Sequence, residues 1–171
     1  MQRLSRSAPL VAAFLAAIVL ANLAVAAFGQ VALVFTAWVL IPFDMLTRDV
    51  LHERWRGSNL IARMAGLILL GGAITLLANV GAWRVALASF AAFACAMVVN
   101  GLVFDAMFEK HSRFVRMNTS NLAAAVLDSI VFPLVAFGAL DTALSIAQAG
   151  SKFLGGVVWS GALILIVRLK K

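Results

Sequence analysis

The sequence predicts an all-α, polytopic membrane protein: a six-transmembrane-helix bundle that forms a single domain over residues 1–171. First, 64% of the residues are hydrophobic and only 12% are charged, whereas soluble proteins average roughly 45–50% apolar and about 25% charged residues. The mean hydropathy is accordingly high, at +1.03. Second, the apolar runs lack the period-2 alternation of a transmembrane β-barrel. Third, a chain of 171 residues without a Pro-, Ser- or Gly-rich linker accommodates about six spans of roughly 20 residues.

The first span is expected at about residues 9–28, which are apolar except for Asn22. Basic residues precede this run and the triplet Ala24-Val25-Ala26 lies near its end, as in a secretory signal peptide. The run is, however, longer than the roughly 7–15 apolar residues of a signal peptide. We therefore expect an uncleaved helix.

The second and third spans are expected at about residues 31–46 and 60–80. Pro42 lies inside the second span and predicts a kink, because proline removes a backbone hydrogen bond. Gly71 and Gly72 lie in the middle of the third span, where small residues let neighbouring helices approach closely.

The last three spans are expected at about residues 85–104, 118–140 and 150–168. The sixth is short, because its apolar run covers only residues 153–167, about 22 Å of helix against a hydrocarbon core of roughly 30 Å. Lys152, which precedes this run, is therefore expected either inside the membrane or reaching toward its interface.

The formal charge of +7 is spread over the gaps between the apolar runs, which indicates a bilayer rather than nucleic acid as the partner. In the six-span layout only Arg84 and Lys152 lie on one side, and the remaining Lys and Arg residues lie on the other. The positive-inside rule therefore predicts a multi-pass membrane protein with six spans and both termini in the cytoplasm.

The two halves of the chain share a weak pattern. Each half has an Asn late in its first span, and a Pro and an Asp in its second. Halves with three spans each would be inverted relative to one another, as in many transporters. The sequence leaves open whether such a 3+3 inverted repeat exists. The matching residues are Asn22 and Asn100, Pro42 and Pro133, and Asp44 and Asp128.

The polar stretch that follows the second span combines Arg48, Asp49, His52 and Glu53. At i,i+4 spacing a cationic row, Arg48 and His52, runs beside an acidic row, Asp49 and Glu53. Two interpretations are open: a solvated helix end with weak surface ion pairs, or a gate at the cytoplasmic mouth made by Arg48, Asp49 and Glu53. Asp44 is a candidate binding residue because it follows a helix-breaking proline, although it could instead pair with Arg48.

The fifth span carries Asn121 and Asp128, which are two helical turns apart and so are expected on the same side of the helix. Asp128 is about 15 Å from the basic end, which places it near the bilayer midplane. An acid at that depth indicates a substrate or proton site. A protonated Asp that links two helices is the alternative. Asn22 and Asn100 are further candidates, although hydrogen bonds between helices are the simpler explanation for both.

Enzymatic and metal-binding functions find little support in the sequence. Cys95 is the single cysteine, and His111 has no Cys or acid at metal-ligand spacing, so no metal, cofactor or internal disulfide is expected. A P-loop and the motifs Gly-x-Ser-x-Gly and His-Glu-x-x-His are missing from the sequence. The expected partners are a small molecule and the lipid bilayer, with no nucleic acid. Homodimer formation is left open.

Several of these residues together resemble the VUT family, six-helix bacterial membrane proteins that include the queuosine precursor transporters. The resemblance covers the ends of the second and fifth spans well and the rest of the chain loosely. Asn22 in the first span and Lys152 at the start of the last also match. The motifs are the run 48–53 (Arg-Asp-Val-Leu-His-Glu), Ser120-Asn121, Asp128-Ser129 with Phe132, and Ala136-Phe137-Gly138.

The resemblance implies a transporter that imports a 7-deazaguanine such as preQ0 or preQ1 across the bacterial plasma membrane. Carboxylate and carboxamide groups would bind the polar edge of this purine-like base, and aromatic rings would stack on its face. The alternative is the substrate-binding subunit of a vitamin importer that a separate ATPase drives. The expected substrate-binding residues are Asn22, Asp44, Asn100, Asn121, Asp128 and Lys152.

Overall fold

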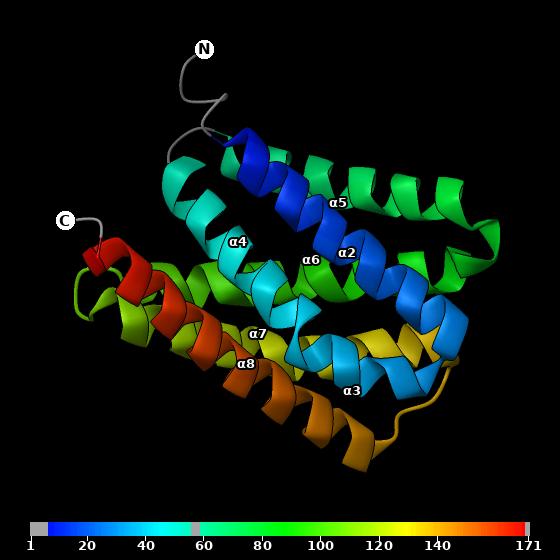
Figure 1. Cartoon of the computed structure of the whole chain (residues 1–171). Coiled ribbons are helices and arrows are strands. Elements are labelled where there is room, and N and C mark those ends of the chain that lie inside the picture. Colours follow the sequence, from blue (N-terminus) through cyan, green and yellow to red (C-terminus); the bar gives the residue numbers. More distant parts are fainter. Residues whose placement is uncertain (1–6, 56–58, 170–171) are drawn as a thin grey trace.

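The computed structural model describes residues 7–55 and 59–169, with side chains to residue 165, and over these residues it is all-helical. The helices lie side by side in one bundle (Figure 1). The elements are α2 (Ala8–Phe28), α3 (Gln30–Trp38), α4 (Leu40–Trp55), α5 (Leu60–Ala78), the 3-10 turn η1 (Val80–Ala82), α6 (Trp83–Ala106), α7 (Arg113–Phe137) and α8 (Thr142–Leu169).

Helix α4 lies between two groups of helices. On one side it packs against α2, which also contacts α5, and on the other it packs against α8, which contacts α7 and through it α6. The beginning of α2 and the end of α8 lie at the same end of the bundle (Figure 1). The polar residues Arg48, Asp49 and Glu53 of α4 meet polar partners on α7.

The distribution of side chains is that of a membrane protein. Large apolar residues face outward, for example Val31 and Leu77, which are 83% and 86% exposed. Polar residues such as Gln148 and Ser160 are buried. Within the described residues, the helices Ala8–Phe28, Leu60–Ala78, Val80–Ala106 and Arg113–Phe137 are long and apolar enough to cross a membrane, and α3 with α4 makes a fifth if this bent pair is one span.

Helix α8 differs from the expected sixth span. It begins at Thr142 rather than near residue 150 and has 28 residues, about 42 Å at 1.5 Å per residue. The helix as a whole is therefore longer than the roughly 30 Å hydrocarbon core, although its apolar run still covers only residues 153–167. It is not among the candidate spans found in the described residues, and buried polar residues occur in its first half.

The predicted kink of the second span lies at Val39, three residues before Pro42. Helix α3 ends at Trp38, α4 begins at Leu40, and the two are bent by 47°. Proline explains this position, because Pro42 has no N–H to donate to the carbonyl of Trp38, four residues earlier.

Gly155 of α8 packs directly against this break. A Cβ atom at Gly155 would lie 2.8 Å from the Trp38 carbonyl oxygen and 2.5 Å from Pro42 Cγ, so only glycine fits. The close contact brings the next turns of the two helices together, including Asp44 on α4 and Lys152 on α8.

Helix α4 also continues to Trp55, well beyond the expected end of the second span near residue 46. Its last turns bury Leu51 and Trp55 in an apolar cluster with Phe14 of α2 and Met64 of α5. Arg48 and Asp49 are consequently inside the bundle, at 3% and 1% exposure. The interpretation of these two residues as a solvated helix end is therefore wrong.

Candidate functional site

A cavity of about 60 Å³ lies where α2, α3, α4, α6, α7 and α8 meet. It has room for a few water molecules, since each needs at least about 10–15 Å³ by this measure. Its lining combines charge, carboxamides and aromatic rings, which is the composition of a site for a polar, flat molecule. The polar and aromatic residues that line it are Asn22, Thr36, Asp44, Arg48, Ser89, Phe93, Asp128, Phe132, Gln148 and Lys152.

An ion pair between α8 and α7 forms one wall of the cavity. Lys152 Nζ donates to Asp128 Oδ2 at 2.5 Å and to Ser129 Oγ at 3.0 Å. The Lys152 side chain is 3% exposed and that of Asp128 is 20% exposed. A charge this deep is tolerated only when it is paired, so Lys152 and Asp128 hold each other in place at the cavity.

Among the described residues that line the cavity, three have a buried polar atom without a hydrogen-bond partner, and one of these atoms, Arg48 Nε, lies 3.8 Å from Asp49 Oδ1. Asp44 Oδ1 on α4 accepts no hydrogen bond, and Gln148 Nε2 on α8 donates none. Asp44 is 4% exposed and Gln148 is 1% exposed. An unsatisfied buried group costs about 1–3 kcal/mol, so native proteins keep one only where a ligand, water or function requires it.

Gln148 is the residue that the sequence analysis missed. It lies four residues before Lys152, on the same face of α8. The i,i+4 spacing is visible in the sequence, but it indicates a shared helix face only if the helix includes residue 148, and the sixth span was expected to begin near residue 150.

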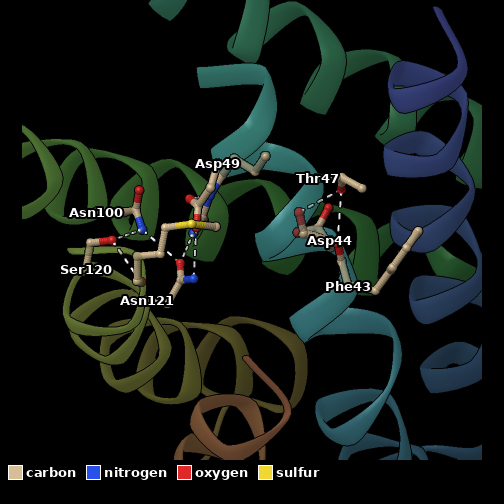
Figure 2. A network of polar contacts seen from close by, with 9 residues as sticks. Phe43, Asp44, Thr47, Asp49, Asn100, Ser120 and Asn121 are labelled. Carbon is tan, nitrogen blue, oxygen red and sulfur yellow. Dashed lines mark hydrogen bonds and ion pairs between the residues drawn. The ribbon is translucent and has the colours of Figure 1, made fainter. Parts of the chain in front are cut away.

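A second polar cluster, the amide network, joins α4, α6 and α7 through Asn121. Asn121 Oδ1 accepts hydrogen bonds from Arg48 Nη2 and Asn100 Nδ2, both at 3.0 Å. Asn121 Nδ2 donates to Asp49 Oδ2 at 2.9 Å, and Asn100 also donates to Ser120 Oγ at 3.1 Å. Figure 2 shows Asp49 turned toward this network while Asp44 lies on a different face of α4.

Arg48 connects the cavity to a larger groove. The groove has a volume of about 780 Å³, lies between α4, α5 and α6, and is mostly apolar. Arg48 lines both the cavity and the groove. Its guanidinium, held by Asn121, therefore stands in the wall that separates them.

The comparisons with known proteins identify the family. A family model described as "Putative vitamin uptake transporter" matches residues 10–168, most of the chain. This chain belongs to the VUT family. This match confirms the resemblance found in the sequence. It also shows a membrane transporter family, which implies a small-molecule substrate. No curated protein and no solved structure matches the chain.

In this VUT chain the predicted binding residues separate into two groups. Asn22, Asp44, Asp128 and Lys152 line the cavity. Asn22 also donates to Thr75 Oγ1 of α5 at 3.3 Å, so it links helices as well. Asn100 and Asn121 belong instead to the amide network. Asn121 and Asp128, expected to act on one side of α7, thus contact different clusters.

The predicted gate residues are also divided. Arg48 and Asp49 lie in the amide network, with Arg48 Nε 3.8 Å from Asp49 Oδ1. Glu53 lies one turn further along α4 and pairs with Arg113 at 2.5 Å and Arg116 at 3.1 Å, both of α7. Its carboxylate is 22% exposed. Glu53 therefore ties α4 to α7 closer to the basic end of the bundle.

Metal binding finds no support in the site. Among the described residues, no group of three or more His, Cys, Asp or Glu side chains is arranged to hold a metal ion. The groups present at the cavity are suited to hydrogen bonding and to charge compensation.

Proposed function

We propose that this VUT-family protein imports a queuosine precursor, a 7-deazaguanine such as preQ0 or preQ1, across the bacterial plasma membrane. The family match supports transport of a small molecule. The choice of a purine-like base rests on the resemblance in the sequence and on the chemistry of the cavity lining. In this proposal six helices cross the membrane, with α3 and α4 as one broken span and α8 as the sixth, and both termini are cytoplasmic.

One observation carries the proposal: an unpartnered acceptor and an unpartnered donor line the same cavity. Asp44 Oδ1 can accept a hydrogen bond and Gln148 Nε2 can donate one. The ring amide of a 7-deazaguanine offers an N–H and a C=O side by side, which complements this pair. Phe93 and Phe132 in the lining supply faces on which a flat ring can stack.

The cavity must widen before a base can enter. Its volume of about 60 Å³ is far below the roughly 300–1,000 Å³ of ligand pockets. We interpret this as the closed state of a transporter. The break at Val39 is the natural hinge, because it lets α3 and α4 change their 47° angle while each stays helical.

Arg48 and Asp49 act as the gate on the side of the basic helix ends. Arg48 separates the cavity from the groove. Breaking its hydrogen bond to Asn121 would join the two spaces and give the base a route out. Glu53 with Arg113 and Arg116 forms an outer latch that holds α4 against α7.

Uptake of radiolabelled preQ0 tests the proposal. Purified protein is placed in liposomes without any ATPase, and exchange of external labelled preQ0 for internal unlabelled preQ0 is measured. Asp128→Asn, which removes the charge partner of Lys152 in the cavity wall, is expected to slow exchange by about tenfold or more, the effect of losing about 1.4 kcal/mol. Asp141→Asn is the control, since it changes an exposed acid and keeps an acceptor for Leu144 N–H.

The outcomes are distinct. If the wild-type protein exchanges preQ0 and the Asp128→Asn variant does so at the same rate, the assigned site is contradicted. Wild-type protein that binds preQ0 but exchanges it only with a co-purifying ATPase would favour the alternative, a binding subunit of an ATPase-driven importer.

A further inference from the structure

The charges of the cavity and of the adjoining amide network, taken together, do not balance. The carboxylates are Asp44, Asp49 and Asp128, and the cations are Arg48 and Lys152. Three negative groups thus face two positive ones. An uncompensated charge in a low-dielectric interior costs several kcal/mol. One carboxylate therefore has to bind a proton or another cation whenever the cavity is closed.

The contacts show which carboxylate is in surplus. Lys152 is bound to Asp128 at 2.5 Å. Arg48 donates to Asn121 and lies beside Asp49, whose Oδ2 accepts from Asn121. Asp44 Oδ1 and Asp49 Oδ1 both lack a hydrogen bond, but Asp49 Oδ1 lies 3.8 Å from Arg48 Nε, whereas Asp44 Oδ1 has no ion-pair partner among the described residues either. Asp44 is therefore the acid whose charge the surrounding side chains leave uncompensated.

The surroundings of Asp44 contain few other titratable groups. On α4 these are Arg48 and Asp49, on α7 Asp128, and on α8 Lys152. Helices α2 and α3, which also pack on α4, contain no titratable side chain over Ala8–Phe28 and Gln30–Trp38. Figure 2 shows that Asp44 and Asp49 lie on different faces of α4.

We propose that Asp44 carries one proton with each substrate molecule, so that this protein is a proton symporter. The proposal rests on the proposed function and adds its source of energy. A proton from water on the outer side converts the Asp44 carboxylate to a carboxylic acid. When the cavity opens to the inner side, the acid releases that proton to water and becomes a carboxylate again. No other reactant is needed.

Charge balance explains the coupling. With Asp44 protonated, the cluster has two negative and two positive groups, and the closed, substrate-filled state carries no net charge. With Asp44 ionised, closure buries a surplus negative charge. The protonated carrier therefore closes around the base much more readily. By linkage, the bound base must in turn strengthen proton binding.

Accumulation in proteoliposomes tests the proposal. The probe is radiolabelled preQ0, which is neutral and so cannot itself compensate the charge of Asp44. The outside is made two pH units more acidic than the inside, with the membrane potential clamped to zero by potassium and valinomycin. Wild-type protein should accumulate preQ0 with a ceiling of about 100-fold, since one proton per substrate gives tenfold per pH unit.

The Asp44→Asn variant separates coupling from transport. The amide resembles the protonated acid but cannot release a proton. It keeps an oxygen that can accept a hydrogen bond from the base, so exchange of labelled for unlabelled preQ0 at equal concentrations should persist at a reduced rate, while accumulation falls to the level of protein-free liposomes. Asp44→Glu should recover part of the accumulation. Asp141→Asn, an exposed Asp→Asn change, should retain both activities.

Several results would overturn the proposal. Wild-type protein that exchanges preQ0 but ignores the pH gradient, or that responds only to a sodium gradient, is not a proton symporter. Loss of exchange as well as accumulation in Asp44→Asn would assign Asp44 to binding or structure instead. If the wild-type protein exchanges no preQ0 at all, the proposed function fails, and the proton proposal falls with it.

A measurement on the unmodified protein supplements the variants. Purified wild-type protein is mixed with preQ0 in weakly buffered solution, and the pH change is recorded. Binding should take up about one proton per preQ0 bound near the pH where Asp44 is ionised in the empty protein, as reciprocal linkage requires. Binding without proton uptake between pH 5 and pH 9 would contradict the proposal.

Discussion

The two polar clusters on α4 are built from the same kinds of residue but differ in how completely they satisfy one another. In the amide network, Asn121 uses both its oxygen and its nitrogen, and Asn100 bonds to two partners. Only Arg48 Nε and Asp49 Oδ1 are without a hydrogen bond there, and they lie 3.8 Å apart. The two atoms without a hydrogen bond thus belong to one ion pair, in which the opposite charges compensate each other.

The cavity cluster is left incomplete. Its ion pair, Lys152 with Asp128, is satisfied, but Asp44 Oδ1 and Gln148 Nε2 are not. Both residues line the cavity, so a molecule bound there can supply the missing hydrogen bonds. The difference teaches that burial of polar residues in a membrane bundle does not by itself mark a binding site. The sign of a binding site is unsatisfied polar atoms beside a cavity.

The largest effect is expected from breaking the ion pair of the cavity. Lys152→Met leaves Asp128 without its cation, which should lower the free energy of unfolding by about 3–5 kcal/mol and abolish preQ0 exchange. Adding Asp128→Asn removes the unpaired charge. The double variant should recover most of the stability but none of the exchange. Thermal unfolding in detergent and the liposome assay report the two effects. A double variant as unstable as Lys152→Met would refute the pairing argument.

A smaller effect is expected from replacing a buried amide by leucine, and it should differ between an amide without a hydrogen-bond partner, Gln148, and one with partners, Asn118. Gln148→Leu removes an unpartnered amide, so stability should stay the same or rise, while the dissociation constant for preQ0 should increase about tenfold, or about 1.4 kcal/mol. Titration of preQ0 in a thermal-shift assay measures both.

Asn118→Leu is the matched control. Asn118 also joins α7 to α8, but its Nδ2 donates to Phe114 O at 2.8 Å and to Ser160 Oγ at 3.0 Å. Its loss should cost about 1–2 kcal/mol of stability and leave preQ0 binding unchanged. The reverse pattern, with stability lost at Gln148 and binding lost at Asn118, would invalidate the distinction between satisfied and unsatisfied buried amides.

The smallest effect concerns the wall between cavity and groove. Asn121→Ala keeps both buried charges but frees Arg48, at a cost of about 1 kcal/mol. The open state should then be about fivefold more populated. In a Cys95→Ser background, a Ser89→Cys probe lining the cavity should react about fivefold faster with a membrane-impermeant maleimide applied from the basic end.

Asn118→Ala supplies the comparison for this labelling experiment, because it removes a neighbouring buried amide of α7 that does not hold Arg48. Its labelling rate should match that of the parent. Equal acceleration by both variants would indicate general loosening of α7, and Arg48 would then have no role as a gate.

Much of the fold could be predicted from local sequence. Long apolar runs predicted the helices because backbone groups inside a bilayer must be satisfied within the helix. The bounds were less accurate, since α4, α7 and α8 continue past their apolar runs into polar residues. Pro42 predicted the break, although the bend itself lies at Val39. Gly155 determines how closely α8 approaches this break, and the local sequence did not predict that contact.

The candidate site could be predicted only in part. Asp128 and Lys152 stood out as charges within apolar surroundings, and they proved to be partners across two helices. Gln148 did not stand out, because a single polar residue near the start of a helix is common. Asn121 and Asp128 were expected together from their spacing along α7, but the spacing gives no information about which neighbouring helix each one contacts.

The sequence by itself determined that this protein is a helical membrane protein of the VUT family, because hydropathy and local motifs are properties of neighbouring residues. Only the tertiary structure decided which polar groups satisfy one another and which are left over. Arg48 meets Asn121 across 73 positions of the chain, while Asp44 and Gln148 reach the same cavity without partners. The physical reason is that a buried hydrogen bond or ion pair depends on distances between helices, and these are set by the packing of the whole bundle.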